Sequence, residues 1–326
     1  KCVATKNEIA LLRASQLLVM TMKKEFYSNG KLLITGEYLV LDGAKAFALP
    51  TKFGQNLIVE KGNNQEIKWT SFDSDGSIWF EETFSFTDIS KKNISEEATS
   101  KRNTLIEILH EGFLLNPDFL NQSKGYSVKT QLTFPRNWGL GTSSTLINNI
   151  AQWLKIDAFV LLKNSFGGSG YDIACAQNNT PILYHLENDN PIVEKATFAP
   201  KFSENLYFVY LDKKQSSKAA IASYYNNKNE DLSENITTID LLTHEVLKAK
   251  TLQEFSQTLE EHEAEMSNIL EMLTIKESLF SDFNGVIKSL GAWGGDFVLA
   301  VAKENPSGYF KKKGFKTIVS YKDMIL

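Results

Sequence analysis

The sequence predicts an α+β fold divided into two lobes. Its 326 residues are enough for two domains with sizeable cores. Strand-like and helix-like segments are mixed without the regular βαβ alternation that marks a doubly wound parallel sheet. The residue pattern also changes near residue 190, where predicted short strands and glycine-rich turns are followed by long amphipathic helical stretches. We therefore expect one domain over residues 23–190 and a second over residues 191–326.

Periodicity and turn residues predict the elements of the first lobe. Alternating apolar runs indicate strands, and apolar residues at helical spacing indicate helices. Asp75–Gly76 is a hairpin turn signal, and Pro135 ends a strand. In chain order we expect two short strands broken by glycine turns within residues 30–51, a hairpin over 64–87, a helix over 101–115, a strand over 125–134 and a helix over 143–154.

The second lobe is expected to be richer in helix. A strand over residues 205–212 precedes two amphipathic helical stretches over 239–250 and 252–273. Residues 291–302 then indicate a glycine turn that enters a buried strand.

Composition and charge narrow the function classes. The chain is 42% hydrophobic and 23% charged, as is typical of a soluble globular protein. Its formal net charge is −4. Nucleic-acid-binding proteins usually carry a basic face, so we expect no nucleic-acid partner. The one dense basic run, residues 310–316, is short and is expected to be a solvated hairpin or helix end.

No segment indicates a membrane span or a zinc site. No apolar run reaches the roughly 18 residues that a membrane span needs. The two cysteines form no disulfide framework, and no Cys/His cluster has zinc-site spacing. Residues 1–22 are expected to be a leader outside the fold, and their interrupted apolar stretches do not fit a signal peptide. The cytoplasm is the expected compartment.

The turn before the helix at 143–154 is a candidate phosphate site. Gly139 and Gly141 would let the backbone approach an anion closely. A helix N-terminus adds unpaired N–H groups and a partial positive charge. Thr142, Ser143 and Ser144 could bond phosphate oxygens or ligate a metal, but Ser143 or Ser144 could equally be an ordinary N-cap. The stretch matches neither a Walker loop nor a Rossmann fingerprint.

Three further segments could carry chemistry. Asp172 follows a run of glycines and a serine at an expected helix start, where it could orient a hydroxyl or simply favour the helix dipole. Lys31 lies at a strand start, where a lone lysine is usually solvated. Glu37 and Tyr38 follow the turn at Gly36. The last segment is a tight glycine turn over residues 291–295.

The order of these four segments resembles the GHMP kinase superfamily, which includes galactokinase, homoserine kinase, mevalonate kinase and phosphomevalonate kinase. The resemblance runs from about Lys23 to the end of the sequence. It implies a two-lobed fold, with a ribosomal protein S5 domain 2-like N-terminal lobe and a ferredoxin-like C-terminal lobe. It also implies ATP and Mg²⁺ as cofactors.

The resemblance assigns the glycine turn to the nucleotide. In that family the turn wraps the ATP phosphates, and its second serine, which falls at Ser143, binds Mg²⁺. The matching residues of this chain are Gly139, Leu140, Gly141, Thr142, Ser143 and Ser144.

The resemblance also assigns catalytic and substrate-binding residues. Asp172 matches the aspartate that orients the substrate hydroxyl or takes its proton, and Lys31 matches a lysine near the same hydroxyl. A neighbouring lysine should lower the pKa of Asp172, so we expect proton transfer late in the reaction. The residues implied for substrate binding are Glu37, Tyr38, Ser169, Gly170, Gly294 and Gly295.

The sequence departs from the family pattern in three places. Thr142 replaces a serine, and Trp293 stands where glycine is usual. The interval between Ser144 and Asp172 is shorter than in the family, by about one helix. The family's metal-binding glutamate comes from that interval, and no residue here matches it.

The expected function is ATP-dependent phosphorylation of a small molecule. The run GYDIA at residues 170–174 resembles the mark of a bacterial group of GHMP kinases, and the longer segment GSGYDIA resembles phosphomevalonate kinase and its relatives. Mevalonate or phosphomevalonate is therefore the favoured acceptor, in isoprenoid precursor synthesis. The alternatives are a sugar or homoserine type of GHMP kinase, diphosphomevalonate decarboxylase and a non-catalytic ligand-binding protein. A homodimer is an option that the sequence leaves open. Candidate cations and hydroxyls for a substrate phosphate are Lys213, Lys214, Ser216 and Ser217, for which a solvated loop is the alternative.

Overall fold

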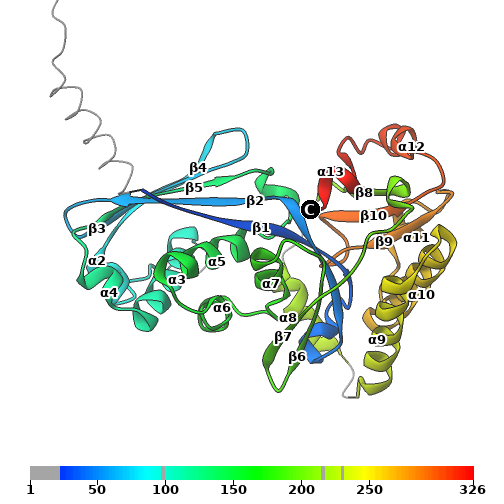
Figure 1. The fold of residues 1–326 in the computed structure, drawn as a ribbon, viewed down its shortest axis with the longest axis horizontal. Coiled ribbons are helices and arrows are strands. Elements are labelled where there is room, and N and C mark those ends of the chain that lie inside the picture. The colour runs from blue at the N-terminus through cyan, green and yellow to red at the C-terminus, as the bar shows by residue number, and fades with distance from the viewer. Residues whose placement is uncertain (1–22, 97–99, 214–216, 229–230) are drawn as a thin grey trace, which may run out of the picture.

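The computed structural model describes residues 23–96, 100–213, 217–228 and 231–326. It confirms an α+β fold with two sheets, one of seven strands and one of four (Figure 1). The expected leader at residues 1–22 lies outside the described residues. Within the described ranges, no helix is both long enough and apolar enough to cross a bilayer.

The first sheet is built around the two long strands β1 and β2. They pair antiparallel along most of their length, with a bulge between Asn29 and Lys31. The main path runs β4-β3-β5-β2-β6-β7, and β1 pairs with β2 beside it. The strands are β1 (Lys24–Thr35), β2 (Ala46–Lys61), β3 (Glu66–Phe72), β4 (Ile78–Ser85), β5 (Tyr126–Leu132), β6 (Ile182–Glu187) and β7 (Asn190–Lys195).

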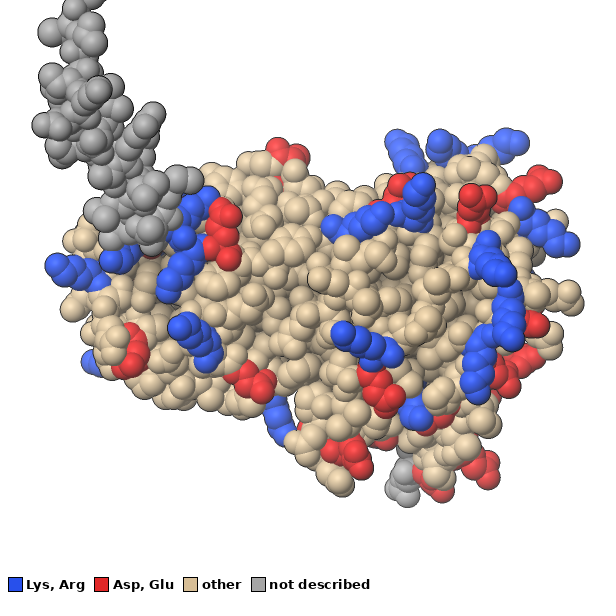
Figure 2. Space-filling model, viewed as in Figure 1, with Lys and Arg blue, Asp and Glu red and all other residues tan. Residues whose placement is uncertain are grey.

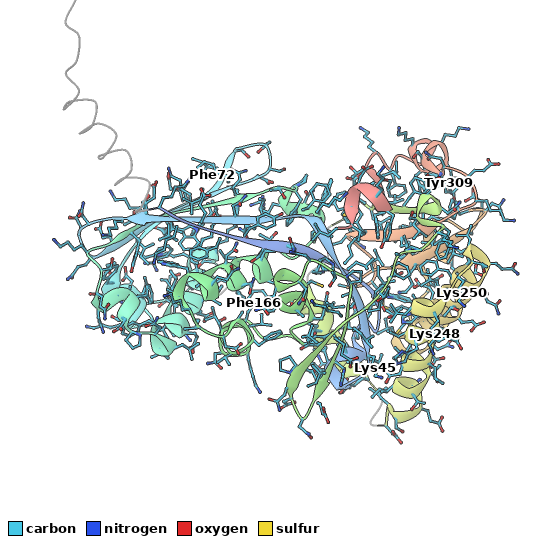
Figure 3. All side chains as sticks on the ribbon, in the orientation of Figure 1. Lys45, Phe72, Phe166, Lys248, Lys250 and Tyr309 are labelled. Carbon is cyan, nitrogen blue, oxygen red and sulfur yellow. The ribbon has the colours of Figure 1, made fainter. Side chains whose placement is uncertain are left out.

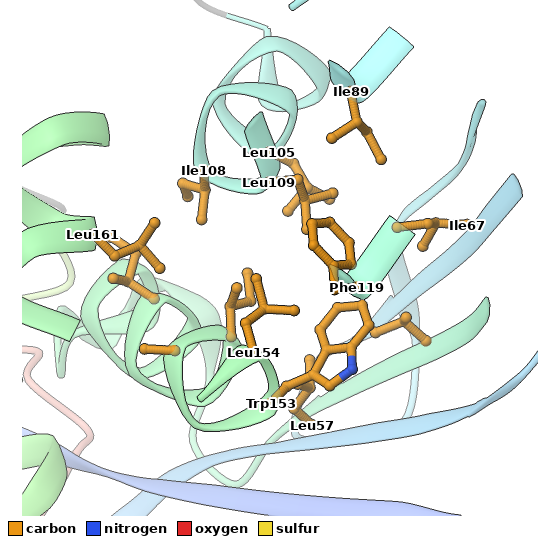
Figure 4. Close-up of a cluster of buried hydrophobic side chains, with 14 of the residues drawn as sticks. Leu57, Ile67, Ile89, Leu105, Ile108, Leu109, Phe119, Trp153, Leu154 and Leu161 are labelled. Carbon is orange, nitrogen blue, oxygen red and sulfur yellow. The ribbon is translucent and has the colours of Figure 1, made fainter. Parts of the chain in front are cut away.

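Helices cover one face of this sheet and enclose its main core (Figures 1 and 4). Leu109 and Trp153, from two of these helices, meet Leu57 of β2 in a cluster of buried side chains. Burial of such apolar surface is the main force that holds helices on a sheet. The helices are α2 (Phe86–Ser90), α3 (Lys101–Leu115), α4 (Asp118–Asn121), α5 (Thr142–Leu154), α6 (Ala158–Ser165) and α7 (Tyr171–Gln177), with 3₁₀ turns η1 (Leu39–Asp42) and η2 (Arg136–Trp138).

The second lobe has a four-stranded sheet in the order β11-β8-β10-β9. Its β-α-β-β-α-β chain order gives the ferredoxin-like arrangement that the resemblance implied. The elements are the 3₁₀ turn η3 (Ser203–Asn205), β8 (Leu206–Tyr210), α8 (Ser217–Asn227), α9 (Ser233–Lys248), α10 (Leu252–Leu270), α11 (Ile275–Leu279), β9 (Val286–Ser289), β10 (Phe297–Val301), α12 (Ser307–Lys312), β11 (Ile318–Ser320) and α13 (Tyr321–Met324).

The two lobes share a buried core. One hydrophobic cluster contains Phe47 and Leu132 of the first sheet together with Phe208 and Phe297 of the second. Polar contacts join the lobes as well: the backbone N–H of Lys45, labelled in Figure 3, donates to the α9 carboxylate of Asp240 at 2.6 Å. The lobes are therefore packed against each other rather than linked only by the chain.

Most predicted elements are confirmed, with two corrections. The strands expected within residues 30–51 are not short, because β1 passes through Gly30 on a bulge and β2 continues through Pro50. The apolar run after Gly36 forms the 3₁₀ turn η1 instead of strand, since Gly36 and Tyr38 both have left-handed φ and turn the chain back. The second sheet starts only at β8, and β7 pairs with β6, so the division near residue 190 remains a proposal.

Charged side chains of both signs are distributed around the face seen in Figure 2. They leave a broad uncharged area across its middle. The basic run at residues 310–316 lies at the end of α12, where Lys311 and Lys312 are exposed and Phe310 is buried. This confirms the expected solvated helix end.

Two leucines on α3 should differ sharply in their contribution to stability. Leu109 is fully buried in the main core, whereas Leu114 on the same helix is 58% exposed. We expect Leu109→Ala to lower the free energy of unfolding by about 2–5 kcal/mol and Leu114→Ala to change it by less than about 0.5 kcal/mol. Urea denaturation followed by circular dichroism measures both, and equal losses would contradict the core assignment.

Candidate active site

The N-terminus of α5 is free of side-chain caps. Its N-cap is Gly141, with a left-handed φ of 96°, and no side chain of the described residues caps its first N–H groups. Ser144 Oγ instead donates back to the carbonyl oxygen of Gly141 at 3.0 Å. The N-cap interpretation of Ser143 and Ser144 is therefore wrong. The first backbone N–H groups of the helix remain available to an anion.

This helix end opens into a cavity of about 500 Å³ between the lobes. The glycine turn, the β1 lysine, the start of α7 and the late glycine turn all contribute to its wall. The structure thus brings together segments that lie far apart in the sequence. The predicted site residues that line the cavity are Lys31, Tyr38, Gly139, Gly141, Thr142, Ser143, Ser144, Ser169 and Asp172.

Thr142 carries an unused polar atom at this wall. Its Oγ1 is buried and has no hydrogen-bond partner among the described residues. A buried hydroxyl without a partner costs free energy unless a ligand or water bonds it. Together with the uncapped helix end, this hydroxyl fits a phosphate group.

Lys31 is held beside the glycine turn by its own backbone. It follows the β1 bulge, and its N–H donates to the carbonyl oxygen of Leu140 at 3.0 Å. Its Nζ lies 5.7 Å from the ring centroid of Tyr171. Burial alone would lower the pKa of Lys31, but Tyr171, Asp172 and Asp296 outweigh it, so the pKa is raised. Lys31 is therefore a partly buried cation rather than the solvated strand-edge lysine of the simpler interpretation.

Asp172 lies in the first turn of α7, directly after Gly170 at φ 93°. The N–H of Ile173 donates to Asp172 Oδ1 at 3.0 Å. Burial raises the pKa of Asp172, and Lys31 only partly opposes this. The expectation of a lowered pKa is thus corrected: Lys31 forms no direct ion pair with Asp172 in the described structure, so desolvation outweighs its attraction. A raised pKa makes Asp172 a stronger base than expected.

Two polar side chains that line the cavity, those of Tyr171 and Asp296, were not among the predicted site residues. Tyr171 lies against Lys31, and burial raises the pKa of its hydroxyl to about 12. Asp296 follows the late glycine turn with a left-handed φ of 51° and places its carboxylate against Gly139. The signal available in the sequence was the place of Asp296 directly after the glycine pair Gly294–Gly295.

Five of the predicted residues do not line the cavity. Glu37 is only 1% exposed and lies behind the wall, in an ion pair with Lys288. The others are Leu140, Gly170, Gly294 and Gly295. Their implied binding roles therefore remain a prediction.

The wall opposite the glycine turn is mostly apolar. Phe166, which Figure 3 labels close to α7, lines the cavity together with Leu33 and the η1 side chains Val40 and Leu41. Ala220 and Ile221 add one side of α8. Of the phosphate-binding candidates next to α8, Lys213 is exposed. Lys214 and Ser216 lie outside the described residues, as does the side chain of Ser217.

The cavity also holds oxygen donors that suit a hard cation. Ser143 lines it, as do the carboxylates of Asp172 and Asp296. Hydroxyl and carboxylate oxygens are ligands that Mg²⁺ accepts. Among the described residues, no group of three or more His, Cys, Asp or Glu side chains is placed so that it could hold a metal ion by itself. These oxygen donors therefore suit a Mg²⁺ ion that takes its remaining ligands from a bound phosphate.

Gly139→Ala should damage the fold more than the same change at another left-handed glycine. Gly139 has φ 69°, and an added Cβ would overlap the Asp296 carboxylate. Gly76 has φ 83° with nothing within 4 Å. We expect about 1 kcal/mol lost in Gly76→Ala and about 1–3 kcal/mol more in Gly139→Ala. Urea unfolding compares them, and equal losses would show that the contact with Asp296 is loose.

Comparison with known proteins identifies the fold. No protein-family model and no curated protein matches the sequence. Among solved structures, mevalonate kinase of Methanococcus jannaschii matches with a TM-score of 0.65 and 17% identity, over 90% of this chain and 96% of that chain. Phosphomevalonate kinase of Streptococcus pneumoniae, in complex with phosphomevalonate and AMPPNP, matches with a TM-score of 0.67 and 15% identity, over 91% and 99%.

A sugar kinase matches equally well. Galactokinase of Lactococcus lactis, complexed with galactose, has a TM-score of 0.66 and 12% identity, and the match covers 94% of this chain and 92% of that chain. Identities this low show a common fold without fixing a substrate. The chain has the fold of the GHMP kinases.

Proposed function

We propose that this chain is an ATP-dependent kinase that phosphorylates a small molecule. The observation that carries the proposal is the convergence at one cavity of an uncapped helix N-terminus, a buried cation and a carboxylate of raised pKa. These are the parts that phosphoryl transfer requires, because the reaction depends on positioning and on neutralised charge. The fold, shared with mevalonate kinase and galactokinase, supports it.

The turn at residues 139–144 holds the β- and γ-phosphates of ATP in this proposal. Backbone N–H groups at the start of α5 and the Thr142 hydroxyl bond the phosphate oxygens. Ser143 would be one ligand of Mg²⁺, and the carboxylates of Asp172 and Asp296 line the same cavity. Bound Mg²⁺ supplies charge neutralisation on the phosphates.

The acceptor hydroxyl lies next to Asp172 and Lys31. Its oxygen forms the new bond to the γ-phosphorus while the bond from that phosphorus to the β,γ-bridging oxygen breaks and ADP leaves. Asp172 orients the hydroxyl and takes its proton, which its raised pKa favours. Lys31 balances the negative charge that develops on the transferring group.

Mevalonate or phosphomevalonate is the proposed acceptor. The apolar wall of Leu33, Val40 and Leu41 suits a branched hydrocarbon skeleton better than the many hydroxyls of a sugar. Neighbours in structure include both mevalonate kinase and phosphomevalonate kinase. A phosphate on the acceptor would need a second cation, for which Lys213 at the edge of the described structure is a candidate.

A panel of acceptors tests the reaction and the substrate together. ADP release with Mg·ATP is measured against mevalonate, phosphomevalonate, diphosphomevalonate, galactose and homoserine. We expect turnover with one mevalonate compound only. Turnover with galactose or homoserine would overturn the acceptor, and phosphate release with loss of CO₂ from diphosphomevalonate would indicate a decarboxylase. No turnover and no ATP binding would overturn the kinase proposal.

Asp172→Asn tests the proposed base. The amide keeps the shape of the side chain but cannot take a proton, so we expect kcat to fall by about 10²–10⁴-fold. Binding of Mg·ATP, measured by calorimetry, should persist. Asp189→Asn is the matched control, because its side chain is 89% exposed. Near-normal turnover of a folded Asp172→Asn protein would exclude a base at this position.

A further inference from the structure

Behind the cavity wall lies a buried charged cluster that the proposed chemistry does not use. Its members are Glu37 at the end of β1, His262 and Glu263 on α10, and Lys288 on β9. All four are at most 4% exposed. Burying charges in this way is costly, so it calls for a specific role.

The cluster links two parts of the cavity wall. On one side, the N–H of Gly36 donates to His262 Nε2 at 3.2 Å, and Glu37 pairs with Lys288. The residues that follow form η1 and carry Tyr38, which lines the cavity. On the other side, Glu263 accepts from the backbone N–H of Ser289 at 3.0 Å, just before the glycine turn at residues 291–295.

The two wall segments also touch each other directly. The N–H of Trp293 donates to the Tyr38 hydroxyl at 3.3 Å. A shift of the cluster therefore moves both the η1 segment and the late glycine turn relative to the cavity.

One carboxylate oxygen of the cluster is not satisfied. Glu37 Oε2 is buried, has no hydrogen-bond partner within the described part of the chain and lies 3.6 Å from His262 Nε2. That nitrogen accepts from Gly36, which assigns the imidazole proton to Nδ1, a buried atom that itself has no hydrogen-bond partner among the described residues. Burial first, and Lys288 second, lower the pKa of His262 far below its usual range, which keeps the ring neutral. An ionised Glu37 therefore leaves a buried carboxylate oxygen, Oε2, with no hydrogen-bond donor among the described residues.

A proton on Glu37 Oε2 removes the uncompensated negative charge at this buried oxygen. With Glu37 and Glu263 ionised and Lys288 charged, the cluster carries one net negative charge, and a proton on Oε2 cancels it. Burial raises the pKa of Glu37 to about 7, while Lys288 opposes and Glu263 adds to the rise. Tyr38 is the other titratable group that faces Glu37, and its pKa is raised, mainly by burial. The proton therefore binds and leaves near neutral pH.

We propose that Glu37 is a positioning residue, which sets the two wall segments through the His262–Glu263–Lys288 cluster by gaining or losing one proton. The acceptor side of the cavity is set by this proton, because Tyr38 and the late glycine turn form part of it. Among the described residues, no hydrogen bond or ion pair joins the nucleotide turn at residues 139–144 to the cluster, so we expect the main effect on the acceptor side. The effect on catalysis rests on the proposed kinase function, whereas the proton equilibrium does not.

The sign of the pH dependence follows from the raised pKa. The folded state keeps a proton on Glu37 that the unfolded chain loses at its usual, lower pKa. The contribution of this proton to the free energy of unfolding is complete below the pKa of Glu37 in the unfolded chain. It is lost as the pH rises through the folded pKa of about 7. The protonated form is therefore the ordered form of the wall, and acceptor binding should weaken as pH increases through this range.

Nitrogen chemical shifts of His262 test the proton equilibrium directly. The full chain, labelled with ¹⁵N-histidine, has four histidines, and His262→Gln assigns the signal. We expect a neutral Nδ1–H ring whose Nε2 shift titrates with a midpoint near pH 7. Glu37→Gln, which mimics the protonated side chain, should abolish this titration. Glu265→Gln, on the same helix but bonded to Asn235, should leave it unchanged. A flat His262 signal in the natural sequence, or an unchanged midpoint in Glu37→Gln, would overturn the proposal.

Steady-state kinetics test the positioning role. The KM for the acceptor should rise about fivefold as pH increases through the same midpoint, the low end of usual coupling between sites. The KM for Mg·ATP should not follow this midpoint. In Glu37→Gln the acceptor KM should stay at its low-pH value. If the acceptor KM followed the same pH course in the natural sequence and in Glu37→Gln, the positioning role would be refuted. A titrating His262 signal without any kinase activity would support the proton equilibrium and refute the kinase function.

Discussion

The cavity depends on the close approach of the backbone at Gly139 and Gly141 to its neighbours, which side chains at these two positions would prevent. A Cβ on Gly139 would overlap the carboxylate of Asp296, and one on Gly141 would lie 2.7 Å from Ser144 Oγ. Both glycines also have left-handed φ, which disfavours other residues. Because the turn is this narrow, the start of α5 faces Lys31 and Asp172 across one small volume. The electrostatic character of the site follows from that proximity.

Aromatic packing holds the narrow turn between the lobes. Trp138, the residue before Gly139, packs its ring edge-to-face against Phe53 of β2 and against Phe297 of β10, with centroids 5.4 Å apart in each pair. Tyr210 of β8 donates its hydroxyl to the carbonyl oxygen of Asn137 at 2.9 Å. Such ring pairs add stability beyond their buried area. The phosphate turn is thus fixed by both sheets, which preorganises it.

Local patterns predicted the elements well and the tertiary contacts poorly. The hairpin turn at Asp75–Gly76 and the helix over residues 101–115 follow from turn chemistry and periodicity, which act within a few residues. Family resemblance placed Asp172 and Lys31 in one cavity. Glu37 was assigned to the substrate because its burial against Lys288 depends on a distant strand. The raised pKa of Asp172 was missed for the same reason, since desolvation is set by the whole fold.

The long sequence separation within the cavity has a consequence for folding. Lys31 comes from the first strand and Asp296 from the turn before β10, so the cavity closes only when both sheets have formed and docked. Contacts between distant segments lose loop-closure entropy before they stabilise the fold, so they form slowly. Refolding chains should therefore recover secondary structure before they recover a ligand site. During synthesis, the ribosome must release most of the chain before the cavity exists.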